Sequence, residues 1–393
     1  MKRILALDGG GIRGVFTLEV ILQIENLLRA HYAKQDPAKA KNFVLRDHFD
    51  FLAGTSTGAI IATCLCWGMS AQRVLDLYLD QGSKMFEKVP FRNLTKKIAS
   101  LYDPGPISEF LQGLFKDENG RDATLASPLL RNGKKKNLLM VVVRNHTTGS
   151  AWPLTNNPKA KFNKPGRPDD NRQIPLWQLV RASTAAPVFF PPERVQLGAS
   201  EYVFVDGSIT PYSNPALIAA LTAILPGYHV DWPTGPDKIR VVSIGTMAFS
   251  SEVPIGDPGL RLGFLANSIP MAAVQSLTAL LQSTGWQQDY LCRCLGQCIF
   301  GECLDIEVGY LADALDAADL DESGQCKYPL WRPRPEPWFS YVRYNRTFKK
   351  KEMVQILEND PSLKRIDAVH AIPRLREIGR DYAQQNVKLE HLI

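Results

Sequence analysis

Short apolar runs alternate with segments of helical periodicity through the first 250 residues. The spacing of Val20, Ile24, Leu27 and Leu28 predicts one helix, and a second apolar helix is predicted at residues 59–68. The apolar runs predict strands at residues 3–7, 48–54, 137–144, 201–207 and 239–245. Because strands that alternate with helices favour a sheet covered on both faces, we expect a three-layer α/β/α fold with a mostly parallel central sheet.

The pattern changes after about Ser250, where mostly helical stretches follow. They are interrupted by the proline-rich sequence YPLWRPRPEPWF at residues 328–339. We therefore expect a main domain at residues 1–250 and a mostly helical extension at residues 251–393 that packs on it. Within the main domain, the polar segment at residues 156–175 is rich in Pro and Gly and predicts an exposed loop.

The composition is that of an ordinary globular protein, with 45% hydrophobic and 22% charged residues in a chain of 393. The net charge of +6 is compatible with an anionic membrane surface but is far from that of a dedicated nucleic-acid binder. No run is long and apolar enough to span a bilayer, and the N-terminus predicts a buried strand in place of a signal peptide. We therefore expect a cytoplasmic protein.

The seven cysteines form a poor disulfide framework because their number is odd and their spacing uneven. Four of them cluster in irregular spacing at Cys292, Cys294, Cys298 and Cys303. This spacing favours buried or half-buried thiols over a tetrahedral zinc site, so no metal is expected. The basic run Lys349–Lys351 favours a solvated helix face, with contact to a membrane or a ligand as the alternative.

Glycines follow the first predicted strand in the sequence DGGGIRG. Gly9, Gly11 and Gly14 have the spacing of a dinucleotide-binding turn, but any glycine-rich turn before a helix offers backbone amides to an anion. A dinucleotide site also needs an acid at the end of a second strand ~20 residues later. Residues 31–42 are polar and predict no strand, so we expect no dinucleotide cofactor and a different anion at this turn.

The second predicted strand ends in the sequence GTSTG, with an apolar helix after it. This strand–turn–helix context favours a nucleophile elbow, in which Gly54 and Gly58 let the backbone turn sharply and expose the hydroxyl of Ser56. The N-terminus of the following helix favours negative charge that develops near the serine. A plain glycine turn is the alternative interpretation.

A nucleophilic serine needs a base, and none of the six histidines lies in a loop after a late strand with a clear acid partner. Asp206 does end an apolar strand, in YVFVDG. A free carboxylate is a weak base, and partial burial makes it a better one by raising its pKa. The alternative is an aspartate that only caps a turn, which is common at strand ends.

Together these motifs resemble the patatin-like phospholipases, lipid acyl hydrolases that use a Ser–Asp dyad. The resemblance rests on four pieces of sequence: residues 8–14, residues 54–58, the segment RASTAAPVFFPP at residues 181–192, and Asp206-Gly207 followed by Asn214-Pro215. Order and rough spacing agree with that family over about residues 3–250. Ser208 is a departure, because the family usually has Gly or Ala there, and a small side chain should fit.

The resemblance implies a role for each matching residue. Ser56 is the expected nucleophile and Asp206 its general base. The backbone amides around Gly10 and Gly11 are expected to bind the oxyanion, with Arg13 helping to fix the loop. The residues implied for the oxyanion hole are Gly9, Gly10, Gly11 and Arg13.

The implied function is hydrolysis of fatty-acyl esters of membrane glycerophospholipids, without metal or cofactor. Neutral glycerides and galactolipids stay open as substrates. The implied partner is a membrane surface, contacted from the cytoplasm, and residues 83–102 mix aromatics with lysines as a lid or membrane-facing element would. An amphipathic helix packed on the sheet is an equally good interpretation of that segment.

Two alternative functions stay open. Some bacterial patatin-like proteins are antiphage effectors that a cyclic nucleotide switches on, and the tail after Ser250 is the candidate region for such a ligand. The other alternative is an inactive lipid-binding or scaffold relative, against which the intact Ser56 and Asp206 argue. Nucleic acid is not expected as a partner, and a homo-oligomer is compatible with the sequence.

Overall fold

The computed structural model describes residues 1–85, 100–130, 137–249, 269–302, 336–348, 352, 356 and 360–393. Its strands are β1 (Lys2–Leu7), β2 (Phe51–Thr55), β3 (Leu138–Asn145), β4 (Ser150–Thr155), β5 (Glu193–Leu197), β6 (Ser200–Asp206), β7 (Ile239–Ile244), β8 (Ala248–Phe249), β9 (Gln297–Phe300), β10 (Ser340–Tyr344) and β11 (Thr347–Phe348). Its α-helices are α1 (Gly14–Gln35), α2 (Pro37–Lys41), α3 (Thr57–Trp67), α4 (Ala71–Met85), α6 (Gly105–Leu114), α7 (Leu176–Ser183), α8 (Ala216–Ile224), α10 (Ile269–Leu295) and α12 (Ile372–Asn386).

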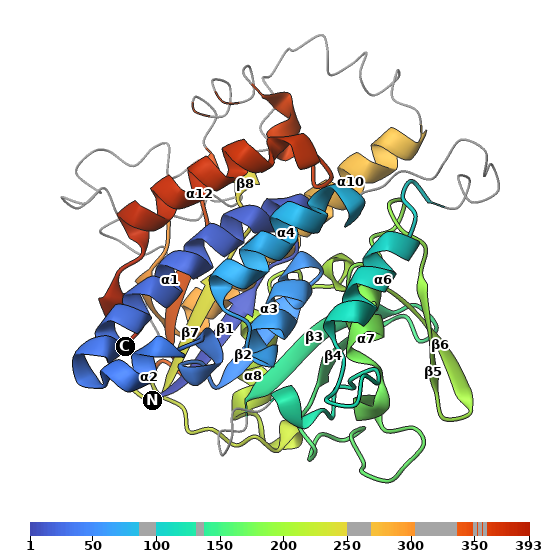
Figure 1. Cartoon of the computed structure of the whole chain (residues 1–393), viewed down its shortest axis with the longest axis horizontal. Coiled ribbons are helices and arrows are strands. Elements are labelled where there is room, and N and C mark those ends of the chain that lie inside the picture. Colours follow the sequence, from blue (N-terminus) through green and yellow to red (C-terminus); the bar gives the residue numbers. More distant parts are fainter. Residues whose placement is uncertain are drawn as a thin grey trace.

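A mixed sheet forms the centre of the molecule, with strand order β5-β6-β3-β2-β1-β7-β10-β9 and β4 paired to β3 (Figure 1). Neighbouring strands from β3 to β9 along this order are parallel, whereas β4 and β6 run antiparallel to β3 and β5 antiparallel to β6. All five predicted strands are present, and the expected fold class is confirmed. The carboxyl ends of β1 and β2 lie side by side, and residues that follow such strand ends form sites in open α/β sheets.

The alternation of side chains along the strands divides the core into two layers. Leu5 and Leu7 face the side covered by α1, α3 and α4, whereas Ile4 and Ala6 face α8 and the end of α10. Helix α12 packs alongside α1 on the outside of the first layer (Figure 1). Both faces of the sheet are therefore covered, as continuous apolar strands require.

The described part of the tail after Ser250 is largely helical, as its sequence predicted, but it also contains strands that were not predicted. Helices α10 and α12 are present, but β9 and β10 extend the central sheet beyond β7. Strand β10 pairs with β7 along its whole length, from Ser340 opposite Arg240 to Tyr344 opposite Ile244. The aromatic and β-branched sequence SYVRY explains the strand, because such residues pack well in a buried sheet.

Several sequence features lie partly or wholly outside the described residues. The Lys349–Lys351 run, Cys303 and most of the segment at 83–102 are among them. Among the other clustered cysteines, Cys292 is buried, Cys294 half-buried and Cys298 exposed. The segment at 156–175 forms turns and one short 3₁₀ helix, and it is exposed only in part, because Asn156, Asn163 and Asp170 are buried. None of the described helices combines the length and apolarity needed to cross a bilayer.

Candidate active site

Ser56 occupies a sharp turn between β2 and α3. Its backbone has φ 55° and ψ −124°, a conformation that non-glycine residues rarely adopt. The flanking glycines allow the turn because a Cβ at Gly54 would lie 2.1 Å from the Gly58 carbonyl oxygen, and one at Gly58 would lie 2.2 Å from the Leu7 oxygen. The strained, crowded turn has the form of a nucleophile elbow.

Asp206 ends β6 beside this turn. The register explains the meeting: Thr55 pairs with Val142 on β3, and the next residue, Val143, pairs with Asp206. The Ser56 Oγ donates a hydrogen bond of 2.7 Å to Asp206 Oδ2, and both side chains are more than nine-tenths buried. Two residues 150 positions apart in the sequence thus form a hydroxyl–carboxylate pair with the geometry that proton transfer requires.

The two oxygens of the Asp206 carboxylate have different partners. While Oδ2 accepts from Ser56, Oδ1 accepts a 2.7 Å hydrogen bond from the Ser208 backbone N–H. The turn-capping role that the sequence left as the alternative is therefore real, and it coexists with the contact to serine. The backbone bond fixes the rotation of the carboxylate and so points Oδ2 at the hydroxyl.

Burial raises the pKa of Asp206 to about 6. The Ser208 N–H, the Ser56 hydroxyl and the charge of Arg181 oppose this rise, because each stabilises the ionised carboxylate. At neutral pH the group is ionised and is a stronger base than a free aspartate.

Two residues of the 181–192 segment support this pair, although the sequence gave them no individual role. The Ser183 Oγ accepts a 2.9 Å hydrogen bond from the Ser56 backbone N–H and donates one of 2.6 Å to the Val142 carbonyl. Arg181 is fully buried, its guanidinium 5.1 Å from the centre of the Phe190 ring. The sequence singled out this segment only through the family resemblance, and its one local signal was an arginine between apolar residues.

The glycine loop lies next to the Ser56 hydroxyl. The Gly9 N–H donates to the Ser213 carbonyl at 3.0 Å, so this amide holds the loop and is directed away from a substrate oxyanion. Within the described part of the chain, the amides of Gly10 and Gly11 have no such acceptor, and both residues line the cavity that contains Ser56. Of the residues expected at the oxyanion hole, Gly10 and Gly11 are therefore the two whose backbone N–H groups are available as donors.

Arg13 is buried behind the loop, where its Nε lies 3.5 Å from the Gly10 carbonyl oxygen as a long hydrogen bond. It lines a second small cavity on the side of the loop away from Ser56, together with Asp8 and Thr246. Burial lowers the pKa of Arg13 to about 10, which leaves it protonated at neutral pH. This position fits the expected role of fixing the loop.

A cavity of about 60 Å³ adjoins the Ser56–Asp206 pair. Apolar side chains make up most of its wall, and Leu281 and Ile366 of the tail contribute to it. Ser208, the departure from the family pattern, also lines it with a buried hydroxyl. None of the six histidines, all within the described residues, lies on this wall. The cavity offers a serine, a carboxylate and free amides next to an apolar wall.

Comparison with known proteins finds a matching family and relatives of similar sequence, among them three phospholipases. The family model of patatin-like phospholipases matches residues 5–220. A cGAMP-activated phospholipase of Escherichia coli (strain TW11681) is 29% identical over 249 residues, which are 62% of each chain. A cGAMP-activated phospholipase of Vibrio cholerae serotype O1 (strain ATCC 39315 / El Tor Inaba N16961) is 28% identical over 62% of this chain and 64% of that protein. An intracellular phospholipase A2 of Caenorhabditis elegans is 29% identical over 54% of this chain and 16% of the worm protein.

The alignments span less than two thirds of the length of each of these relatives. The family match begins within β1 and ends within α8. It therefore contains all four pieces of sequence on which the resemblance was based, the glycine loop, the serine turn, the 181–192 segment and Asp206 with the residues that follow it. Because the family model matches more than half of the sequence, this chain belongs to the patatin-like phospholipase family.

Proposed function

We propose that this protein hydrolyses fatty-acyl esters of membrane glycerophospholipids, with Ser56 as nucleophile and Asp206 as general base. The observation that supports this most strongly is the 2.7 Å hydrogen bond from Ser56 Oγ to the buried Asp206 carboxylate. The inactive relative is disfavoured, because a chain without catalysis has no need of a strained serine aimed at a buried base.

In the first half-reaction, Asp206 accepts the hydroxyl proton while Ser56 Oγ attacks the ester carbonyl carbon. The Gly10 and Gly11 amides donate to the oxyanion of the tetrahedral intermediate, and removing one such donor typically costs ~10²–10³ in rate. The intermediate collapses when the lysolipid oxygen leaves and takes the proton from Asp206. The acyl group then remains on Ser56.

In the second half-reaction, Asp206 removes a proton from water as the water oxygen attacks the acyl carbonyl. Collapse of the second intermediate releases the fatty acid, and the proton held by Asp206 returns to Ser56 Oγ. These steps use only side chains and amides of the chain, so the proposal includes no cofactor. The apolar wall of the cavity suits the methylene groups of an acyl chain next to the ester carbonyl.

The test is fatty-acid release from phosphatidylcholine and phosphatidylglycerol vesicles. Wild type should release fatty acid, and Ser56→Ala and Asp206→Asn should each lose at least ~10³-fold in rate. Asp360→Asn is a matched control, because Asp360 Oδ1 accepts the N–H of Ser362 as Asp206 Oδ1 accepts that of Ser208. Full activity in Asp206→Asn would refute the assignment of the base.

A second candidate function is the same hydrolase under control of a cyclic nucleotide. It is favoured by two relatives named as cGAMP-activated phospholipases. Under this candidate, contact with the membrane from the cytoplasm would follow activation. Fatty-acid release should then rise by about tenfold or more when cGAMP is added to the wild type, and equal release with and without cGAMP would reject it.

A further inference from the structure

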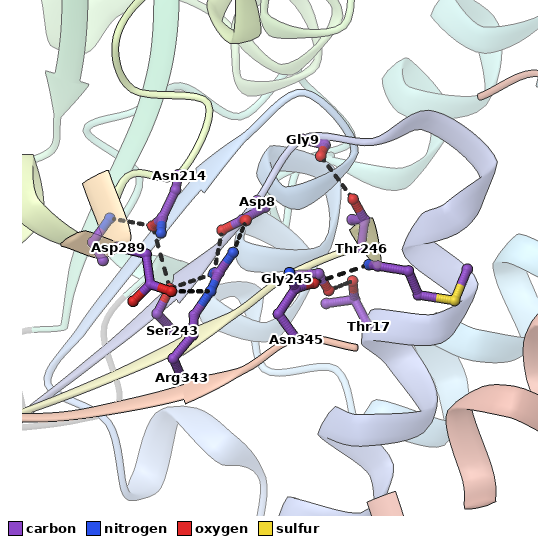
Figure 2. Close-up of polar contacts among 12 residues, drawn as sticks. Asp8, Gly9, Thr17, Asn214, Ser243, Gly245, Thr246, Asp289, Arg343 and Asn345 are labelled. Atoms are coloured by element: carbon purple, nitrogen blue, oxygen red, sulfur yellow. Dashed lines mark hydrogen bonds and ion pairs between the residues drawn. The ribbon is translucent and has the colours of Figure 1, made fainter. Parts of the chain in front are cut away.

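A buried ion pair joins the tail to the start of the chain. Arg343 of β10 donates from both terminal nitrogens to the carboxylate of Asp8, at 2.9 Å to Oδ1 and 2.5 Å to Oδ2 (Figure 2). Both side chains are more than nine-tenths buried. Asp8 is the residue that directly precedes the glycine loop, whereas Arg343 lies more than 100 residues beyond the family match.

Further polar contacts fix the guanidinium of Arg343. Its Nη1 also donates to Ser243 Oγ at 2.7 Å, and that hydroxyl donates to Asn214 Oδ1 at 3.2 Å. Asp289 of α10 lies 3.9 Å from the Arg343 Nε (Figure 2). The same carboxylate pairs with Arg293 at 2.9 Å. The arginine is therefore held in one orientation by Asp8, by Ser243 of β7 and by the charge of Asp289 on α10.

The neighbouring tail residue Asn345 supports the glycine loop through the turn after β7. Its Oδ1 accepts a 3.0 Å hydrogen bond from the Met247 backbone N–H, which holds the turn after β7. Thr246 in that turn donates from its hydroxyl to the Gly9 carbonyl at 3.0 Å (Figure 2). Arg343 of β10 thus contacts Asp8 directly. Asn345, just after β10, acts on Gly9 through the turn after β7. Asp8 and Gly9 directly precede Gly10 and Gly11.

We propose that Arg343 is a positioning residue, which holds the glycine loop through Asp8 so that the Gly10 and Gly11 amides point at the oxyanion. The inference rests on the proposed hydrolase function and adds that the tail completes the active site. A bidentate pair sets both the place and the rotation of a carboxylate, which a single point charge does not. The Asp8 backbone then transmits this constraint to the next three residues.

The charge balance makes the pair sensitive to substitution. Burial and, to a smaller extent, the charge of Asp289 raise the pKa of the Asp8 carboxyl, and Arg343 opposes that rise. Without the guanidinium, a buried carboxylate would lack its partner and would take up a proton or move toward water. Either change releases the start of the loop.

The test compares Arg343→Met, Arg343→Lys, Asp8→Asn and the double variant Asp8→Asn/Arg343→Met. Arg346→Met is the matched control, since Arg346 lies on the same tail in a partly exposed ion pair with Glu352. Two quantities are measured: kcat and KM for p-nitrophenyl butyrate, and hydrogen–deuterium exchange of the peptide at residues 8–14. Melting temperatures identify any variant that fails to fold, in which case Arg343→Lys replaces it.

We expect Arg343→Met to lower kcat by about 10- to 100-fold with little change in KM, because a small displacement of oriented groups costs up to ~10² in rate. Arg343→Lys keeps the charge but cannot form the bidentate contact, so its kcat should lie between those of wild type and Arg343→Met. The double variant should lose no more than the worse single variant, since both residues act through one contact. Exchange at residues 8–14 should rise in Arg343→Met and stay unchanged in Arg346→Met.

The proposal is overturned if Arg343→Met keeps the wild-type kcat and loop exchange, or if Arg346→Met produces the same losses. A change in KM alone would also overturn it, because a loop that serves the oxyanion acts on kcat. If wild type cleaves no ester, the proposed function fails while the exchange measurement still decides whether Arg343 orders the loop.

Discussion

At the scale of single residues, the central feature is the burial of one carboxylate beside one hydroxyl. Asp206 combines a backbone contact at Oδ1 with the Ser56 contact at Oδ2, and burial raises its pKa to about 6. The sequence predicted that this aspartate ends a strand. It could not predict that one carboxylate oxygen contacts the backbone while the other contacts the serine, because the serine contact depends on a register between strands far apart in the chain.

The raised pKa leads to a prediction about pH. As the proposed base, Asp206 works in its ionised form, so activity should be present above about pH 6 and fall as the pH drops through that value. At pH 5 about a tenth of the plateau in kcat/KM should remain. A profile of kcat/KM for p-nitrophenyl butyrate between pH 4.5 and 8 checks this, with circular dichroism to confirm folding. A flat profile down to pH 4.5 would contradict it.

At the scale of elements, the serine turn depends on close backbone contact. The GTSTG pattern predicted the turn and its neighbouring strand and helix from local sequence alone. The reason for the second glycine is not local, since a Cβ there would lie 2.2 Å from the Leu7 carbonyl oxygen and 2.7 Å from that of Asp8. Such a contact is visible only once β1 and β2 are paired.

Crowding at Gly58 and open space at Gly113 predict opposite effects on stability for Gly→Ala substitutions at these two positions. Gly58→Ala should lower the free energy of unfolding by about 1–3 kcal/mol, because the added methyl meets backbone that cannot move aside cheaply. Gly113→Ala in α6 should raise it by about 0.5 kcal/mol, since a Cβ there has nothing within 4 Å and alanine favours a helix. Urea unfolding of the three proteins measures both. Equal stability of Gly58→Ala and wild type would contradict the predicted clash between the added methyl group and the backbone.

The tail strands show the limit of reading elements from sequence. The aromatic and β-branched residues at 341, 342 and 344 are compatible with a strand, but the preceding proline-rich run and the helical stretches around it favoured a helical tail. Its pairing with β7 joins residues about 100 positions apart. Pairing at this separation depends on the whole sheet, which no local pattern encodes.

At the scale of the whole molecule, alternating strands and helices were enough to predict the three-layer fold. The strand order, with β1 between β2 and β7, was not predictable from local patterns. The meeting of Ser56 and Asp206 was predicted only through resemblance to a family. Arg343 was missed because it lies beyond the matched motifs and its partner Asp8 was interpreted as part of a glycine turn.

The most direct test of the central claim is to trap the acyl-enzyme. Wild type, Ser56→Ala and Ser108→Ala are mixed with p-nitrophenyl butyrate, quenched in acid within milliseconds, and digested for peptide mass analysis. Ser108 is the control because its hydroxyl donates to the carbonyl of Pro104 at the start of its own helix, away from the Ser56–Asp206 pair. The account predicts a butyryl mass on the peptide that contains Ser56 in wild type and Ser108→Ala, and none in Ser56→Ala. A butyryl group on another residue, or hydrolysis that persists in Ser56→Ala, would contradict it.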